Sequence, residues 1–548
     1  MLDILIQNAE VIDGTGAPRR RMDVGILGTK LVLPPPGAEH FPENCPKTSD
    51  GCDRPDTAEA PFARRVIDAS GLILSPGFID VHGHTDLFAF LEPLCSAKLC
   101  QGITTELGGQ CGLSPAPVRA SRFLTYREYY KNQGAPVYPE AETFTSLNSL
   151  METLEKLRTG IHMALFAAHG TIRLAAMGME PGPPDRSQMD AMVSMAREAM
   201  EDGALGISSG LMYAPGSFAG KEELTGLCLA AAPFGGIYTS HIRNQGNGLT
   251  GSVKEALEIA VRGGLTANIS HHKAVGKSNW GRVAESTALI HEAGTATHDV
   301  YPYTASSTTL AATLPPSCMK DGPEQLLLKL RDTGFRKELE HRIFSPNEEW
   351  DNDLMECGYD GILIISAAKT PETVGKTLLQ CAENWGLPPF AAYCRLLSEN
   401  HLAVNDICFS MSPEDVKNLI QDPLCMFGTD SLYVPGLMPM THPRAIGTFP
   451  RILGRFVREE KLLPLEEAVR KMTGLPAKRY GLSGKGLIAE GMDADLVLFD
   501  PLSIGDRADY QNPFRKNRGI HSVYVDGTLS LSDGKPTGAR AGRILRRL

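Results

Sequence analysis

The sequence predicts an α/β protein: a (β/α)8 TIM-like barrel, a small β-sandwich domain formed by both chain ends, and a long insertion between barrel strands 7 and 8. Three observations support this. Eight short apolar runs alternate with helical patterns through the middle of the chain, as in parallel sheets with crossover helices. Strand-like runs recur at both ends of the 548 residues. One connection within the alternating region is too long for a simple loop.

The runs at the two chain ends predict one small β domain. Neither end is large enough to bury one face of a sheet alone, so we expect residues 1–70 to pack with 485–548. Residues 34–62, rich in proline, glycine and acidic side chains, predict an exposed insertion within this domain. The predicted strands of the domain are 3–13, 22–33, 65–69, 487–489, 494–499 and 521–525.

Residues 71–484 carry the alternating pattern and are expected to form the barrel. The insertion, residues 312–423, contains helical and strand patterns of its own, and either a lid over the catalytic face or a purely structural role suits its length. Two helices, 444–461 and 465–480, should follow the last strand. The eight predicted strands are the run that ends at His82, then 103–107, 163–168, 205–209, 237–240, 267–270, 295–301 and 424–428.

Composition excludes several classes of protein. The formal net charge of -10 gives no reason to expect nucleic acid or an anionic membrane as a partner. No run approaches the apolar length of a membrane span, and the amino terminus lacks the basic start of a secretory signal, so we expect a cytoplasmic protein. The 12 cysteines are scattered, which favours reduced thiols over a disulfide scaffold. The oligomeric state is not indicated.

The run SPGFIDVHGHTD, Ser75 to Asp86, is the centre of the chemical argument. It places His82 and His84 two residues apart at a strand end, where alternation would point both imidazoles the same way. Neutral imidazole is a common ligand for zinc and related metals. A His-x-His pair is common by chance, however, so the motif needs support from elsewhere in the chain.

That support comes from the ends of other predicted strands. Chemistry in such a barrel sits at the carboxyl ends of its strands. Six residues of metal-ligand type lie at or just past the ends of five predicted strands: His82, His84, Cys111, His241, His271 and Asp430.

A thiolate and two imidazoles form a good zinc set with an open position for water, which is the catalytic pattern. Asp430 could accept a proton from a metal-activated water and return it to a leaving nitrogen. Singly, each residue also has a structural explanation, since a lone histidine at a strand end is usually hydrogen-bonded and a lone cysteine is usually a buried thiol. Together they predict a metal site.

These motifs resemble the amidohydrolase superfamily, and specifically its N-acyl-D-amino-acid deacylase (D-aminoacylase) branch. The resemblance covers most of the chain and is carried by SPGFIDVHGHTD, GITTELGGQCGLSPAP, SHIRNQG, ISHHKAVGKSNWGR, FGTDS and HPRAIGTFPRILGRFVREE. Cys111 stands where hydantoinase-like relatives use a carbamylated lysine, and the predicted fourth strand, ALGISSG, offers no lysine. Ser431 departs from the glycine that relatives tend to have after the aspartate.

The resemblance implies one tightly bound Zn²⁺ on Cys111, His241 and His271. It also implies a second, weaker metal position lined by His82, His84 and Asp430, with Cys111 shared. The implied reaction is hydrolysis of the amide of a small N-acyl-D-amino acid to a carboxylate and a free D-amino acid.

The substrate's α-carboxylate needs a cationic or hydrogen-bonding partner in the protein, because burying the carboxylate unpaired is costly. Candidates are Lys273, Arg243, Tyr213, Tyr301 and Ser307. The resemblance favours Lys273, Tyr301 and Ser307.

Two alternatives stay open from the sequence. One is an amidohydrolase acting on a cyclic amide or an acylated dipeptide, and the other is a barrel that has lost catalysis and serves as a scaffold. Side-chain and acyl preferences are not readable, since loops form those pockets.

Overall fold

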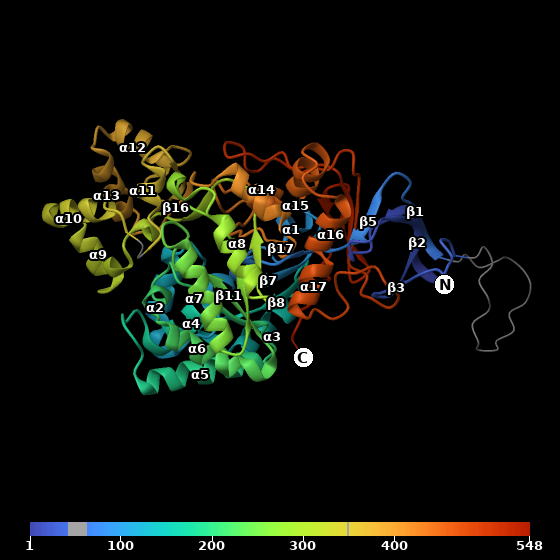
Figure 1. The fold of residues 1–548 in the computed structure, drawn as a ribbon, viewed down its shortest axis with the longest axis horizontal. Coiled ribbons are helices and arrows are strands. Elements are labelled where there is room, and N and C mark those ends of the chain that lie inside the picture. The colour runs from blue at the N-terminus through green and yellow to red at the C-terminus, as the bar shows by residue number, and fades with distance from the viewer. Residues whose placement is uncertain (42–62, 348–349, 548) are drawn as a thin grey trace, which may run out of the picture.

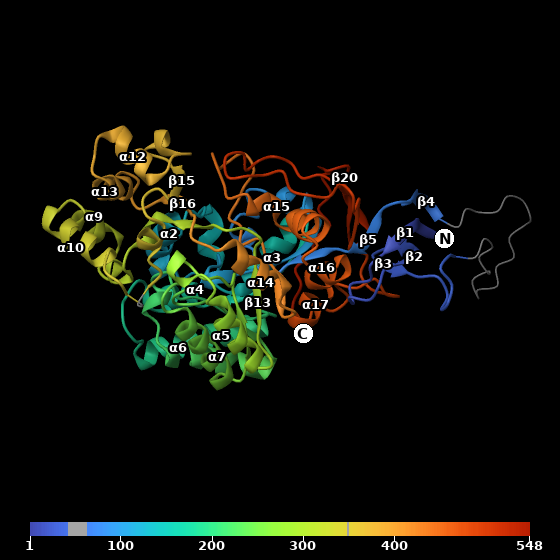
Figure 2. The ribbon, with the colours of Figure 1, turned by 45° about the horizontal axis from the view of Figure 1, so that its top comes forward.

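The computed structural model describes residues 1–41, 63–347 and 350–547. Three parts follow one another along the long axis in Figures 1 and 2. The sheet that contains β1 to β3 lies at one end, a lobe with helices α9 to α13 lies at the other, and the parallel strands lie between them. The fold is α/β, as predicted. Part of the predicted 34–62 insertion, residues 42–62, lies outside the described residues.

Apart from the first, the central parallel strands occur where the sequence predicts them, within two residues at each end. Two sheets have the neighbour orders β6-β7-β8 and β9-β10-β11-β12-β13-β17. The strands are β6 Phe78–Asp80, β7 Ile103–Gly108, β8 His162–Leu165, β9 Ala167–Ala168, β10 Gly206–Gly210, β11 Ile237–His241, β12 Thr266–Ile269, β13 Thr297–Val300 and β17 Cys425–Phe427.

Backbone hydrogen bonds connect the two sheets at both of their edges. The Val81 N–H donates to the Phe427 carbonyl at 3.3 Å, next to β6 and β17, and the Phe166 N–H donates to the Gly108 carbonyl at 3.0 Å. Because Phe166 alone separates β8 from β9, these two segments together correspond to the predicted third strand. The carboxyl ends of all these strands face one region, as a parallel arrangement requires.

Helices alternate with the strands and bury one apolar face against them. In α5, for example, Met192, Met195 and Ala196 are buried in the central core. The helices of this part are α1 Ser96–Leu99, α2 Phe123–Asn132, α3 Leu147–Leu157, α4 His169–Met177, α5 Arg186–Glu201, α6 Lys221–Ala231, α7 Leu249–Arg262, α8 Val283–Glu292, α14 Pro413–Gln421, α15 Arg444–Arg451, α16 Leu465–Met472 and α17 Gly474–Tyr480.

The insertion between β13 and β17 has its own sheet and its own hydrophobic core, which runs from Leu310 to Cys408. It begins slightly earlier than predicted, because β14 pairs with β16. Its elements are β14 Ser306–Thr309, α9 Pro323–Lys329, α10 Thr333–Ile343, α11 Asp353–Cys357, β15 Ile362–Ala367, α12 Leu378–Trp385, α13 Pro389–Glu399 and β16 Val404–Cys408.

Both ends of the chain contribute to one sheet with the order β21-β20-β19-β18-β5-β1-β2-β3, and β4 pairs with β1. The hydrogen-bonded path is continuous, so the expected two-layer sandwich stays a prediction. The strands are β1 Leu2–Val11, β2 Arg20–Leu27, β3 Lys30–Val32, β4 Ala63–Asp68, β5 Ile73–Pro76, β18 Leu496–Phe499, β19 Ile520–Val525, β20 Thr528–Ser532 and β21 Lys535–Pro536.

Two details of the sequence prediction are wrong. The run before His82 is not one strand: Gly77 divides it, so β5 joins the terminal sheet while β6 joins the parallel strands. No strand forms at 487–489, where Ile488 instead donates a single backbone hydrogen bond to Asp13.

None of the helices in the described part of the chain combines the length and the apolar content that a membrane span requires.

Candidate metal centre

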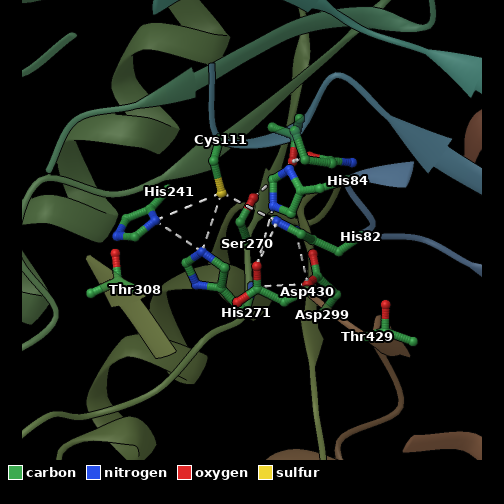
Figure 3. A network of polar contacts seen from close by, with 12 residues as sticks. His82, His84, Cys111, His241, Ser270, His271, Asp299, Thr308, Thr429 and Asp430 are labelled. Atoms are coloured by element: carbon green, nitrogen blue, oxygen red, sulfur yellow. Dashed lines mark hydrogen bonds and ion pairs between the residues drawn. The ribbon is translucent and has the colours of Figure 1, made fainter. Parts of the chain in front are cut away.

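The six predicted ligand-type residues come together at the carboxyl ends of the parallel strands (Figure 3). Each stands at the end of its strand or within a few residues of it. His82 and His84 lie just beyond β6, so the alternation expected for a strand is not what aims their rings. The positions are His82 and His84 after β6, Cys111 in a one-turn 3-10 helix after β7, His241 at the end of β11, His271 after β12 and Asp430 after β17.

The nitrogen, sulfur and oxygen atoms of this cluster converge. The sulfur of Cys111 lies 3.7 Å from Nδ1 of His241 and 3.5 Å from Nε2 of His271, and these two nitrogens are 3.0 Å apart. His82 approaches the same sulfur with Nε2 at 3.3 Å. Oδ1 of Asp430 lies 3.3 Å from Nε2 of His84. Sequence positions more than 300 residues apart therefore share one centre.

The donor set fits zinc. In a tetrahedral site, zinc bonds of ordinary length to sulfur and nitrogen separate those two atoms by about 3.5 Å. The separations from Cys111 to His271 and His241 match this value. Donor atoms of His82, Cys111, His271 and Asp430 all lie within 4.8 Å of one another, so a cation can also be held on that side. One thiolate, imidazoles and a carboxylate form a catalytic rather than a structural zinc set.

Three of these residues have left-handed backbone conformations that side chains other than glycine rarely adopt. The φ angles are +53° at Cys111, +36° at His271 and +47° at Asp430. Such strain costs on the order of 1 kcal/mol or more per residue and concentrates at functional sites. It turns each side chain back over the strand ends, toward the common centre.

The cluster also sets the charges of its own members. Burial raises the pKa of the Cys111 thiol, but the charge of His82 and hydrogen bonds from His241 and His271 outweigh it and hold this pKa well below its ordinary value. Burial likewise raises the pKa of Asp430, yet Arg444 and the nearby histidines hold it well below its usual range. A thiolate and a carboxylate are the forms that bind metal.

A buried ionic network underlies the centre. The Lys98 ammonium donates to Asp80 at 2.7 Å and to Thr429 at 2.6 Å, and it pairs with Glu106 at 2.8 Å. Burial lowers the pKa of Lys98, but the two carboxylates outweigh it and raise this pKa. Because Thr429 precedes Asp430, the network fixes the turn that presents the carboxylate.

Asp299, at the end of β13, is a supporting residue that the sequence analysis missed. Its Oδ1 accepts the His271 backbone N–H at 2.8 Å and lies 3.3 Å from Nδ1 of His82. Carboxylates in this position orient metal-ligating histidines. Asp299 lies two residues before the end of the predicted strand 295–301, so the strand-end rule that identified the ligands did not select it.

A cavity opens beside the metal-type residues. Four of the five predicted substrate contacts line it: Lys273, Tyr213, Tyr301 and Ser307. The Lys273 ammonium donates to Gln245 at 2.8 Å and lies 2.8 Å from Nδ1 of His271, and burial lowers its pKa to about 8. The Ser307 hydroxyl, in contrast, donates to the Asp406 carbonyl at 2.7 Å, so β16 already engages it.

The structure does not bring Arg243, the fifth predicted contact, to this cavity. Its guanidinium pairs with Glu255 at 3.0 Å and donates to the carbonyls of Ser217 and Ala219. The expectation assumed that strand alternation continues past His241, but β11 ends there.

Arg444 occupies the place that Arg243 was expected to take. It lines the cavity, its Nη1 lies 2.8 Å from Oδ2 of Asp430, and its guanidinium lies over the Tyr301 ring, 4.6 Å from the centroid. Its Nη2 donates to the Ser307 carbonyl at 3.1 Å. The residue starts α15, fourteen positions after Asp430, and no periodic signal connects the two.

Two carboxylates from the insertion lie on the same cavity wall. Asp351 accepts the Gly246 backbone N–H at 3.3 Å, and burial raises its pKa to about 7. Burial raises the pKa of Asp353 to about 6, and its Oδ1 has no hydrogen-bond partner among the described residues. Apart from histidines, Lys273 and Arg444 are the cationic side chains of the described lining.

Comparisons with known proteins agree with this site. The amidohydrolase family model matches residues 65–289 and 400–530. An N-acyl-D-glutamate deacylase from Alcaligenes xylosoxydans xylosoxydans is 35% identical over 100% of this chain and 97% of that protein.

Two solved structures cover the whole chain. The N-acyl-D-glutamate deacylase from Bordetella bronchiseptica, complexed with zinc and a phosphonate mimic of the tetrahedral intermediate, is 34% identical with a TM-score of 0.79 over 100% of this chain and 99% of that one. A D-aminoacylase studied for its binuclear metal centre is 30% identical with a TM-score of 0.78 over 100% of both chains.

The chain therefore belongs to the amidohydrolase family. The similarity to these relatives covers the whole chain, from the terminal sheet through the parallel strands and the insertion. Within the family the chain belongs to the N-acyl-D-amino-acid deacylase, or D-aminoacylase, branch.

Proposed function

We propose that this protein is a zinc-dependent deacylase that hydrolyses the amide of N-acyl-D-amino acids to a carboxylate and a free D-amino acid. The observation that carries the proposal is the convergence of Cys111, His241 and His271 next to Asp430, at the edge of a cavity that Lys273 and Arg444 also line. The full-length relatives, which act on N-acyl-D-glutamate or are D-aminoacylases, support the substrate class.

Cys111, His241 and His271 would hold the tightly bound zinc, and His82, His84 and Asp430 would line a second, weaker position. When bound, zinc lowers the pKa of water and polarises the acyl carbonyl. Asp430 accepts the proton of the attacking water, because its low pKa keeps it ionised, and later returns that proton to the departing nitrogen.

The remaining polar groups of the cavity bind and orient the amino-acid part. The planar guanidinium of Arg444 can donate two parallel hydrogen bonds to the α-carboxylate of the substrate. Lys273 and the Tyr301 hydroxyl complete this carboxylate-binding site. The carboxylate-binding site lies directly beside Asp430, so the amide nitrogen attached to the α-carbon is held next to Asp430, which protonates it.

We also infer that the parallel strands close into a (β/α)8 barrel over residues 71–484, apart from β5, which joins the terminal sheet, with residues 1–70 and 485–548 in the small domain. The backbone bonds at both sheet edges support closure. The separate hydrophobic cores of the terminal sheet and of the insertion support the division.

A panel of N-acetyl amino acids tests the function. We expect hydrolysis of N-acetyl-D-methionine, at least about 100-fold weaker hydrolysis of the L-enantiomer, and loss of activity in chelator that zinc restores. N-acetyl-D-glutamate should be at least about tenfold poorer than N-acetyl-D-methionine, because burying a second carboxylate near Asp351 and Asp353 is unfavourable. Absence of D-specific, zinc-restored hydrolysis would refute the proposal.

Replacing Arg444 by methionine should lower kcat/KM about 10- to 100-fold, mainly through KM, because a charge-assisted hydrogen bond to the substrate is lost. The C-terminal amide of N-acetyl-D-methionine, which lacks the carboxylate, should lose much less, and this difference separates binding from damage to Asp430.

Arg451 provides the matched control. It pairs with Asp506 at 2.9 Å and covers the Tyr303 ring at 4.5 Å, but it does not line the cavity. Arg451→Met should leave KM within about twofold of the parent enzyme, since Arg451 contacts Asp506, Tyr303 and the Pro302 carbonyl and none of the residues that line the cavity. If Arg444→Met lowered kcat/KM equally for the acid and for the amide, Arg444 would not be part of the carboxylate-binding site.

A further inference from the structure

A second cavity, the apolar pocket, borders the catalytic cavity. The two cavities share four lining residues, Gln133, Met212, Tyr213 and Thr309. Beyond them it passes between α2 of the barrel and the start of the insertion, where Tyr129, Met179, Ala312, Leu314 and Met319 line it.

The lining determines what can enter this pocket. Among the described residues that form it, Glu128 alone is charged, and its side chain is exposed. No cation is present to seat a carboxylate. An aliphatic chain, in contrast, would exchange water for Met, Leu, Ala and Tyr side chains, which is favourable in proportion to the area buried.

The position of the pocket relative to Asp430 decides which part of the substrate reaches it. The departing nitrogen must lie near Asp430, and the α-carbon and its carboxylate follow it toward Arg444. The acyl substituent extends from the carbonyl carbon in the opposite direction. In Figure 3, His241 and Thr308 lie across the cluster from His82 and His84.

Tyr213 connects that far side to the apolar pocket. Its ring packs against His241 with centroids 5.1 Å apart, and its hydroxyl lies 3.1 Å from Oγ1 of Thr308. A group that extends from the carbonyl carbon past His241 and Tyr213 therefore enters the apolar pocket directly.

We propose that the apolar pocket receives the acyl chain, so that the preferred substrates are D-amino acids carrying a medium- or long-chain aliphatic N-acyl group. This inference rests on the proposed deacylase function. The shared wall of the two cavities, the apolar lining and the placement opposite Asp430 carry it.

An acyl series on one amino acid tests the inference. With D-methionine held constant and the acyl group extended from acetyl through butanoyl, hexanoyl and octanoyl, kcat/KM should rise about two- to fourfold per methylene until the pocket is filled. Free octanoate should inhibit hydrolysis of N-acetyl-D-methionine far more strongly than acetate does, and this measurement requires no variant.

The Ala312→Phe variant locates the effect. The new ring would fill the pocket, so the ratio of octanoyl to acetyl kcat/KM should fall at least about tenfold, in line with the loss of several buried methylenes. The matched control is Ala391→Phe in α13, a half-buried alanine of the same insertion outside the pocket lining, which should keep the parent ratio.

The possible results separate the two proposals. Failure to hydrolyse any N-acyl-D-amino acid would refute the deacylase function itself. Hydrolysis of N-acetyl substrates with a flat or falling acyl series would overturn the acyl assignment alone. So would a series of N-acetyl D-amino acids with lengthening side chains that rises and is abolished by Ala312→Phe, because the pocket would then take the side chain.

Discussion

Replacing Asp430 by asparagine is expected to lower kcat/KM by roughly 10²- to 10⁴-fold, the usual contribution of a positioned acid–base group. Asparagine keeps the size of the side chain and can still contact Arg444 and His84, but it cannot accept a proton. KM should therefore change little. Steady-state kinetics with N-acetyl-D-methionine measure the effect.

The structure also supplies the control for this variant. Asp202, at the end of α5, accepts the Asn148 backbone N–H at 2.9 Å far from the cavity. Asp202→Asn should keep kcat/KM within about twofold, because its side chain touches no cavity residue. Zinc content of Asp430→Asn should stay near one equivalent, since Cys111, His241 and His271 remain. A fully active Asp430→Asn enzyme would exclude Asp430 as the base.

Replacing Cys111 by alanine should reduce zinc affinity by more than about 100-fold, because even outer-sphere partners of a metal site contribute 10- to 100-fold. Activity should disappear with the metal. Metal analysis after dialysis gives a readout that does not depend on activity, and a titration with zinc gives the new dissociation constant.

Cys228 tests whether loss of any buried thiol has the same effect. It is a fully buried, free cysteine of α6, outside the metal-type cluster. Cys228→Ala should lower the free energy of unfolding by about 1 kcal/mol while zinc content and activity stay intact. Normal zinc content in Cys111→Ala would contradict the assigned ligand set.

The sequence predicted the site best where the type of a residue could be combined with its position at the end of a predicted strand. Strand ends in a parallel arrangement must converge, so His241 and His271 could be assigned once the strands were placed. Asp299 was missed because the predicted strand 295–301 extends past it. The left-handed turn at His271 brings Lys273 to the cavity, whereas Arg243, after a strand that ends at His241, is directed elsewhere.

Arg444 and the carboxylates Asp351 and Asp353 could not be predicted in this way. They reach the cavity from a helix start and from an insertion whose placement depends on tertiary packing, and neither has a sequence period that refers to the metal-type cluster. The division at Gly77 of the run before His82 could not be predicted either, because apolar content alone does not say which sheet a strand joins.

The insertion has a hydrophobic core of its own, so it can change in sequence without disturbing the packing of the parallel strands. The proposed catalytic groups lie at the carboxyl ends of the parallel strands, while this lobe contributes much of the lining of both cavities. Mutations in the lobe can therefore explore new substrates while the hydrolytic apparatus is inherited unchanged. Exchanging the lobe between relatives offers a direct route to enzymes with altered selectivity.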